Sequence, residues 1–238
     1  YKDINESNLD KGFGYQELEA PLQILNMTYP NLDETTSDIK ELYGNNGLKN
    51  VMNIKKPQAE FEYKYDDLKI FQKDIIGNYG AKIKNICDSI MISEGIVLVY
   101  SQYIDGGIVP VALALEELGF TRFGRENLFS KPPSELIDAI TMKPKSSVET
   151  NFKPAKYCVI SGDIVLSPNN SKEIKKITDS NDLYGEEVKV VLISRAGSEG
   201  IDLKNVRQIH IIDPWYNMNR IEQIIGRGVR TCSHKDLE

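Results

Sequence analysis

The residues best suited to chemistry lie near the end of the chain, in the run Gln223-x-x-Gly226-Arg227-x-x-Arg230. Residues three apart on a helix share a face, so Arg227 and Arg230 can converge on one anionic target. Guanidinium groups match phosphate oxygens, and an arginine on a transferring phosphoryl group stabilises the charge that develops in the transition state. Two such arginines are more often a solvated helix face, so the pair alone leaves both interpretations open.

A glycine-containing loop precedes these arginines. Residues 188–193 form an apolar run, and residues 194–203 follow it with glycines at 197 and 200. Glycine permits tight turns and close approach of the backbone to a ligand, although most Gly-x-x-Gly patterns are only turns. A second apolar run then ends in Asp213-Pro214-Trp215-Tyr216-Asn217. The order of loop, strand and arginine helix is more informative than any one of them.

Other reactive residue types in this region favour simpler interpretations. Cys232 and His234 are two apart, but a zinc site needs about four ligands and no partner pair is visible, so no metal site is expected. His210 lies in an apolar run and Trp215 in a turn, where packing is the expected role of both. No spacing supports a Ser/His/Asp triad.

Elements that can position these residues alternate between strand and helix from about residue 75 onward. Apolar runs predict strands at 96–100, 120–123, 157–160, 188–193 and 208–212. Helical periodicity predicts helices at 82–92, 111–118, 171–178 and 218–226. This alternation predicts an α/β fold with a parallel sheet, in which ligands bind at the carboxyl ends of the strands.

Two stretches depart from the alternation. Residues 1–74 predict a mainly helical extension, with helices at 15–25 and 33–43 and a loop at 44–47. In the first helix Leu18, Leu22 and Leu25 form the apolar face; Asp33 is the expected N-cap of the second helix and Gly44 its stop. Residues 125–156, rich in Lys, Pro and Ser, predict an exposed insertion whose lysines are either solvated or touch nucleic acid. The predicted organisation is an extension, residues 1–74, and a lobe, residues 75–238.

Composition excludes several classes of protein. Of the 238 residues, 40% are hydrophobic and 27% charged, which fits a globular protein and excludes collagen-like or wholly disordered chains. No membrane span or signal peptide is expected, and three widely spaced cysteines favour reduced thiols inside a cell. The net charge of −6 argues against gripping nucleic acid by bulk electrostatics, although residues 191–238 hold 7 basic against 6 acidic residues.

Taken together, the motifs resemble the C-terminal RecA-like lobe of superfamily II helicases and translocases, particularly the Swi/Snf-related branch. Residues 194–203 resemble motif V, residues 223–230 resemble motif VI, and residues 95–102 are similar to motif IV. The run 213–217 is similar to the Asp-x-x-Trp-Asn turn of Swi/Snf-type proteins. The resemblance covers residues 75–238 well and residues 1–74 poorly.

A finer resemblance is to the helicase-like transcription proteins of large nucleocytoplasmic DNA viruses. The poxviral early transcription factor small subunit and nucleoside triphosphate phosphohydrolase are examples. It rests on three stretches of sequence, at residues 100–107, 115–120 and 225–234.

These resemblances imply that ATP, with Mg²⁺ held by an N-terminal lobe, sits between two lobes. Arg227 and Arg230 would then reach the β- and γ-phosphates as arginine fingers, and Gln223 would order the site. Gly200 and Asp202 would lie near the ribose and the fingers.

The resemblance further implies that DNA or RNA crosses another edge of the lobe. The residues expected near its backbone are small or offer main-chain amides: Ser101, Gln102, Arg195, Ala196 and Gly197. Implied partners are the N-terminal RecA-like lobe of the same protein and subunits of RNA polymerase or transcription factors. The implied location is intracellular, in the host cytoplasm or the virion.

Neither a Gly-x-x-x-x-Gly-Lys-Ser/Thr loop nor an acidic box following a buried strand is present. Both belong to the N-terminal lobe in this family, so the chain is expected to be a fragment that is inactive alone. Two alternatives stay open. The lobe can be a silent scaffold that docks a transcription or replication partner through residues 1–74 or 125–156. A small-molecule α/β enzyme is the other, but it leaves the two arginines without a purpose.

Overall fold

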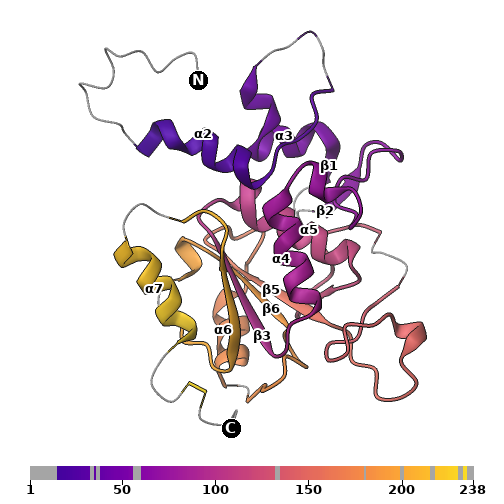
Figure 1. Cartoon of the computed structure of the whole chain (residues 1–238), viewed down its shortest axis with the longest axis vertical. Helices are drawn as coiled ribbons and strands as arrows, with labels where there is room; N and C mark the ends of the chain where they lie inside the picture. Colours follow the sequence, from indigo (N-terminus) through magenta and orange to yellow (C-terminus); the bar gives the residue numbers. More distant parts are fainter. Residues whose placement is uncertain are drawn as a thin grey trace.

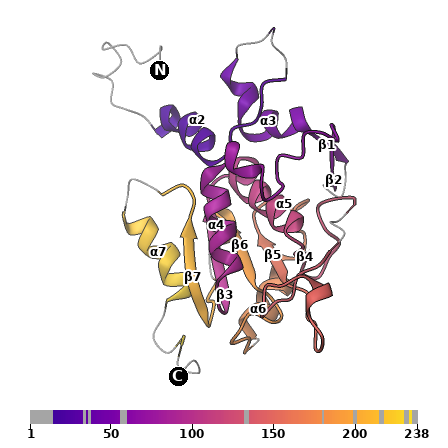
Figure 2. The same cartoon turned by 45° about the vertical axis from the view of Figure 1, so that its right-hand side comes forward.

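The computed structural model describes residues 15–32, 35, 38–55, 60–131, 135–179, 181–198, 201–214, 218–229 and 233–234. Its centre is a five-stranded parallel sheet with the strand order β4-β5-β6-β3-β7 (Figure 1 and Figure 2). The strands are β3 (Ile96–Ser101), β4 (Thr121–Arg122), β5 (Lys156–Ile160), β6 (Val190–Ser194) and β7 (Val206–Ile211). The predicted α/β fold with a parallel sheet is confirmed.

Helices cover both faces of this sheet. Val97 and Val99 point into one core, with α4 (Ala81–Met91) and α5 (Val109–Glu117). Leu98 points into a second core, with α6 (Asn170–Asp179) and α7 (Met218–Gly228). Every residue of β3 and β6 is buried, which explains why their sequences are continuous apolar runs. No helix in the described ranges is long and apolar enough to cross a membrane.

Shorter elements complete the fold. A single turn of π-helix, η3 (Ile104–Ile108), leads into α5. The 3₁₀ turns are η1 (Ile39–Leu42), η2 (Ile76–Asn78), η4 (Lys145–Ser147) and η5 (Ala196–Ser198).

Helix α2 (Tyr15–Asn26) confirms the helix predicted at residues 15–25. Its predicted apolar face is only partly used, because Leu25 is 62% exposed. The buried apolar residues lie just after it, where Met27 and Tyr29 join the core that also contains Ile83 of α4. The chain before residue 75 therefore packs against the lobe, and the predicted boundary at 74 stays a prediction.

The loop predicted at residues 44–47 is wrong, because helix α3 (Gly44–Val51) begins there. Packing overrides the weak helix propensity of this stretch. A Cβ at Gly47 would lie 2.4 Å from Cδ2 of Tyr29, so only glycine allows this close approach. Of the helix predicted at 33–43, the described residues form only η1, whose N-cap is Asp38; Asp33 lies outside the described residues.

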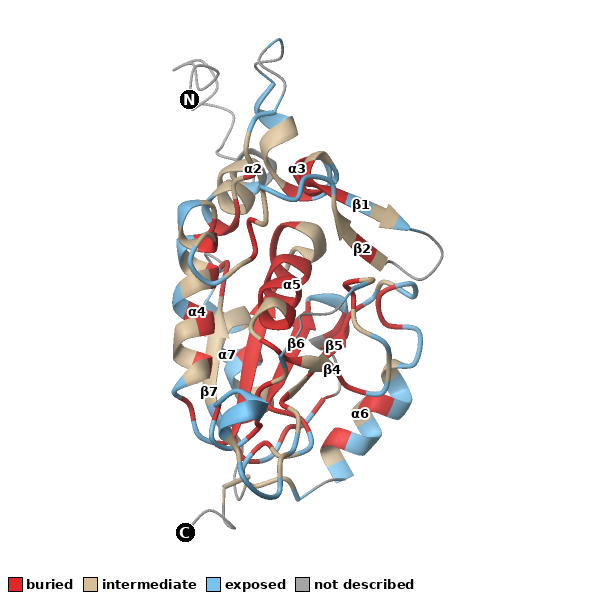
Figure 3. Ribbon diagram, turned by 90° about the vertical axis from the view of Figure 1, so that its right-hand side faces the viewer, coloured by how far each residue is buried: buried red, intermediate tan, exposed pale blue. Residues whose placement is uncertain are grey.

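A small antiparallel hairpin was not predicted. It pairs β1 (Met52–Lys55) with β2 (Glu60–Tyr63). Figure 3 shows the hairpin at the upper right, near α5. Strand β2 also contacts the insertion, because Phe61 N donates to the Leu128 carbonyl at 2.7 Å and Ser130 N to the Phe61 carbonyl at 3.0 Å.

The expectation that residues 125–156 form an exposed insertion is wrong in part. Lys143 and Lys145 are exposed, but the stretch also buries Leu128, Phe129, Ile137, Ala139 and Met142. Asp138 organises it by accepting hydrogen bonds from the backbone N–H groups of Ile140, Thr141 and Lys153. The lysine-rich sequence hides an apolar pattern that packs onto the core.

Candidate functional site

The predicted site residues fall into two groups. One group follows the carboxyl ends of β3 and β6, whose last residues Ser101 and Ser194 are register partners; it contains Ser101, Gln102, Arg195, Ala196 and Gly197. The other is formed by Asp202 and, on α7, Gln223 and Arg227. Gly200 and Arg230 lie outside the described residues.

A buried hydrogen-bond network joins the carboxyl ends of β3 and β7. Asp213, 1% exposed, accepts hydrogen bonds from the Ser101 hydroxyl at 2.5 Å, from Gln102 N at 2.8 Å and from Asn26 Nδ2 at 3.2 Å. Burial raises the pKa of Asp213 above its ordinary value, and these hydrogen bonds oppose the rise by stabilising the carboxylate. The turn residue thus binds two strands and α2 together.

Lys82, in the first turn of α4, extends this network. Its Nζ donates to Asn26 Oδ1 at 3.0 Å and to the Ile212 carbonyl at 3.1 Å. Burial lowers the pKa of Lys82, whereas the charge of Asp213 raises it. We refer to Asn26, Lys82, Ser101, Gln102 and Asp213 as the Asp213 network. Sequence reasoning missed Asn26 and Lys82, because they reach Asp213 only through the fold.

Within the network Ser101 and Gln102 are placed differently. Ser101 is fully buried and its hydroxyl is bonded to Asp213, while Gln102 is partly exposed. Gly107 keeps this arrangement open, because a Cβ there would lie 2.0 Å from the Ser101 hydroxyl oxygen. The predicted contact of both residues with nucleic acid stays a prediction, and the geometry gives Ser101 a role in holding Gln102.

The loop after β6 lies directly on the loop after β5. Arg195 and Ala196 are exposed, whereas Gly197 is buried, and a Cβ at Gly197 would lie 2.2 Å from the Ile160 carbonyl oxygen. A Cβ at Gly162 would in turn lie 2.6 Å from that of Ala196. The carboxyl ends of β5, β6 and β3 therefore form one continuous edge.

Helix α7 lies alongside β7 (Figure 2) and has distinct sides. Ile224 and Gly228 are buried, and Gly228 approaches Val206 closely, with 3.1 Å between a Cβ there and Val206 Cγ1. Gln223 and Arg227, four residues apart, share another side; Gln223 is exposed and Arg227 partly exposed. We call Gln223 and Arg227 the α7 polar stripe.

A backbone hydrogen bond joins the predicted loop to this helix. Leu203 N donates to the Arg227 carbonyl at 2.9 Å, which brings the exposed Asp202 next to the last turn of α7. Beside it, a Cβ at Gly226 would meet no atom within 4 Å outside the local helix backbone. Asp202, Gly226 and Arg227 thus lie on neighbouring backbone segments, and a carboxylate and a guanidinium are residue types that suit a ligand with hydroxyl and phosphate groups.

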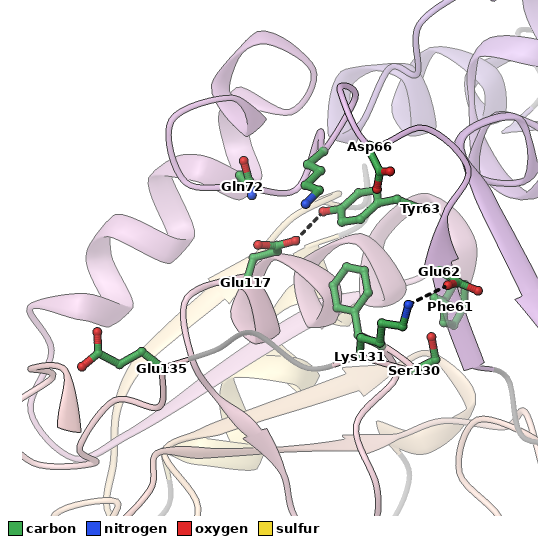
Figure 4. A pocket seen from close by; sticks show the side chains of 11 residues that line it. Phe61, Glu62, Tyr63, Asp66, Gln72, Glu117, Ser130, Lys131 and Glu135 are labelled. Atoms are coloured by element: carbon green, nitrogen blue, oxygen red, sulfur yellow. Dashed lines mark hydrogen bonds and ion pairs between the residues drawn. The ribbon is translucent and has the colours of Figure 1, made fainter. Parts of the chain in front are cut away.

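A separate cavity of about 470 Å³ lies where the β2 strand meets the insertion (Figure 4). Tyr63 donates to Glu117 at 2.8 Å and Lys131 lies 3.7 Å from Glu62 at its wall. Burial raises the pKa of Tyr63, and the charge of Glu117 raises it further. None of the predicted site residues lines this cavity.

Comparison with known families decides the identity of the lobe. Residues 134–232 match the family described as helicase conserved C-terminal domain. The chain contains a helicase C-terminal domain. This helicase domain includes the predicted loop at 194–203 and the arginine helix, while the Ser101–Gln102 end of β3 lies before the matched residues.

Several viral proteins are distant homologues of this chain. "Putative ATP-dependent RNA helicase R563" of Acanthamoeba polyphaga mimivirus is 33% identical over 165 residues, covering 68% of this chain and 24% of its own length. "Termination factor NPH-I homolog" of African swine fever virus (isolate Tick/Malawi/Lil 20-1/1983) is 30% identical over 172 residues, covering 67% and 24%. The chain thus spans about a quarter of the length of these relatives.

Proposed function

We propose that this helicase C-terminal domain is one of the two lobes of a nucleic-acid-dependent ATPase. The observation that carries the proposal is the joining of the two predicted motifs by the Leu203–Arg227 backbone hydrogen bond, which leaves the α7 polar stripe at the surface. The mimivirus relative named "Putative ATP-dependent RNA helicase R563" supports ATP as the nucleotide.

ATP would bind between the α7 polar stripe and a second lobe. Arg227 and Arg230 would contact the β- and γ-phosphates, and their charge would stabilise the transferring phosphoryl group. Gln223 would order these groups, and Gly200 and Asp202 would lie near the ribose. Mg²⁺ would be held by acidic residues of the second lobe; the described residues contain no group of three or more His, Cys, Asp or Glu side chains able to hold a metal.

Nucleic acid would cross the edge formed by the ends of β3, β6 and β5. Gln102, Arg195, Ala196 and Gly197 would contact its backbone, with Ser101 holding Gln102 in place through Asp213. Backbone contacts of this kind read no sequence, so DNA and RNA are both suitable. The sequence resemblance to viral transcription proteins, together with the relative named "Termination factor NPH-I homolog", supports a place in viral transcription, with polymerase or transcription factor subunits as partners.

The proposal is tested in a protein that joins this chain to its N-terminal lobe. Arg227→Ala should lower nucleic-acid-stimulated ATP hydrolysis by about 10³-fold or more, the scale of an arginine finger. Arg207→Ala removes an exposed arginine of β7 whose side chain lies against Gly95, at the amino end of β3, and should leave turnover unchanged.

Equal turnover in the Arg227→Ala variant and the unmodified protein would contradict the arginine-finger role. Failure of the unmodified two-lobed protein to hydrolyse ATP with any DNA or RNA would favour the alternative, a silent scaffold that docks a partner.

A further inference from the structure

The ends of β4 and β5 carry a second polar site that the motifs do not include. Arg122, Arg125 and Asn127 lie in and after β4, and the loop with Ile164 follows β5. A cavity of about 440 Å³ lies between them, and Glu60 and Glu126 complete its polar lining. Because parallel strands end at the same edge of a sheet, this cavity opens where ligands of α/β folds bind.

Two hydrogen-bond donors in this cavity's walls have no acceptor. Asn127 Oδ1 accepts from Arg122 N at 2.9 Å, which leaves the buried Nδ2 of Asn127 without a partner. Arg125 Nε pairs with Glu173 at 2.9 Å, and its buried Nη2 has no partner. Buried polar groups are nearly always hydrogen-bonded, so these two donors call for an explanation. A ligand that satisfies both must offer acceptor oxygens.

The chemistry of the surroundings narrows the ligand. Arg122 adds a buried guanidinium, whose Nη2 donates to the Leu166 carbonyl. Three carboxylates, Glu60, Glu126 and Glu173, lie near these arginines, so bulk positive charge does not attract the ligand. Recognition would therefore depend on individual N–H groups that point at the ligand, which suits an oxyanion such as phosphate. Ile164, 79% exposed, offers apolar surface beside it.

The cavity also continues the edge that carries the predicted nucleic-acid contacts. Gly162, after β5, leaves no room for a Cβ beside Ala196, because such a Cβ would lie 2.6 Å from that of Ala196. From Ser161 the loop runs through Asp163 to Ile164. A strand of nucleic acid that lies over Arg195 and Ala196 would reach this cavity as it passes from β6 over β5 to β4.

We propose that Arg125 and Asn127 bind a backbone phosphate of the nucleic acid. This inference rests on the proposed function and adds a contact, on the edge strand β4, that the predicted motifs lack. The phosphate oxygens would accept hydrogen bonds from Arg125 Nη2 and Asn127 Nδ2. Such a contact lengthens the footprint without reading the base sequence.

The test replaces Asn127 by aspartate. Asn127→Asp keeps an oxygen for Arg122 N and exchanges the unpartnered donor for an anionic oxygen, so the fold is retained while phosphate is repelled. Binding of a labelled oligonucleotide to the 238-residue chain should weaken about 10- to 100-fold, the range for losing hydrogen bonds to a charged group. Thermal denaturation checks that the variant is folded.

Two further variants complete the test. Arg125→Gln should weaken the binding of oligonucleotides of every sequence alike. It should also reduce the slope of log K against the logarithm of the salt concentration by about one. The matched control is Lys73→Gln, which removes an exposed cation beside α4 and α5 and should change neither.

Oligonucleotide binding by Asn127→Asp equal to that of the unmodified chain overturns the inference and leaves the proposed function intact. The NMR chemical shifts of the Asn127 side-chain amide distinguish a nucleic-acid phosphate from free inorganic phosphate as the ligand. Movement of these signals with the oligonucleotide supports the inference. Movement with inorganic phosphate alone, or with neither probe, overturns the assignment to nucleic acid. If the unmodified chain binds no oligonucleotide, the inference fails, whereas the ATPase proposal is judged separately through Arg227.

Discussion

The Asp213 network and the α7 polar stripe are built from similar residue types, but they use them in opposite ways. In the network the Asp213 carboxylate is buried and accepts three hydrogen bonds from within the protein. On the stripe the Gln223 side chain is exposed and the Arg227 side chain partly exposed, while the Arg227 backbone carbonyl accepts the hydrogen bond from Leu203 N. The difference separates polar groups that hold the edge in shape from groups placed to meet a ligand.

The largest effect is expected from a substitution at the centre of the Asp213 network. Asp213→Ala leaves the donors of Ser101, Gln102 and Asn26 buried without an acceptor, and should lower the free energy of unfolding by about 3–5 kcal/mol. Chemical denaturation measures it. Gln223→Ala, at an exposed side chain of the α7 polar stripe, is the matched control and should stay within about 0.5 kcal/mol. Similar losses in both variants would erase the contrast between the two regions.

A second buried carboxylate, that of Glu116, tests whether buried polar groups also hold the insertion in shape. Glu116 accepts hydrogen bonds from Leu128 N at 2.6 Å, from Phe129 N at 2.8 Å and from the Tyr157 hydroxyl at 2.5 Å. Burial raises the pKa of Glu116 from 4.5 to about 7, against the opposing effect of these hydrogen bonds.

The folded protein therefore keeps a proton that the unfolded chain releases above pH 4.5. Stability from this group is present below that pH, and about 3 kcal/mol of it is lost as the pH rises to about 7. Urea denaturation between pH 5 and 8 measures this loss. Glu116→Gln should flatten the slope, and equal slopes in the two proteins would refute the assignment.

Two nearby glycines, Gly226 and Gly228, test which side of α7 is open and which is packed. Gly226→Ala places its Cβ in open space and should raise the free energy of unfolding by about 0.5–1 kcal/mol, because alanine favours a helix. Gly228→Ala should bring no such gain, since its Cβ would lie 3.1 Å from Val206 Cγ1 and 3.2 Å from Ile209 Cδ1. Thermal and chemical denaturation compare the two. Equal gains would show that both sides of the helix are open.

The central strands could be predicted from sequence because burial on both faces leaves a plain signal. The runs at 96–100, 157–160 and 188–193 match β3, β5 and β6 closely. Helix α3 could not be predicted, because its Gly-Asn-Asn-Gly start is typical of a loop. Its stabilising contacts are tertiary: Gly47 lies against Tyr29, and Leu48 and Val51 are buried.

The candidate site was only half visible for a related reason. Arg227 and Gln223 are close in sequence, so helical spacing alone brought them together. Asn26 and Asp213 are 187 residues apart, and no local pattern indicates their hydrogen bond. The unpartnered donors of Arg125 and Asn127 could not be predicted, because they lie in a stretch whose composition suggested a solvated loop.

The most direct test of the account measures stability and turnover in the same variant. Arg227→Ala should change the free energy of unfolding of this chain by no more than about 0.5 kcal/mol, because the side chain lies at the surface. In the two-lobed protein it should lower nucleic-acid-stimulated ATP turnover by about 10³-fold or more. Stable folding with turnover lost is the predicted result; turnover that stays at the unmodified level in a folded protein would contradict the account.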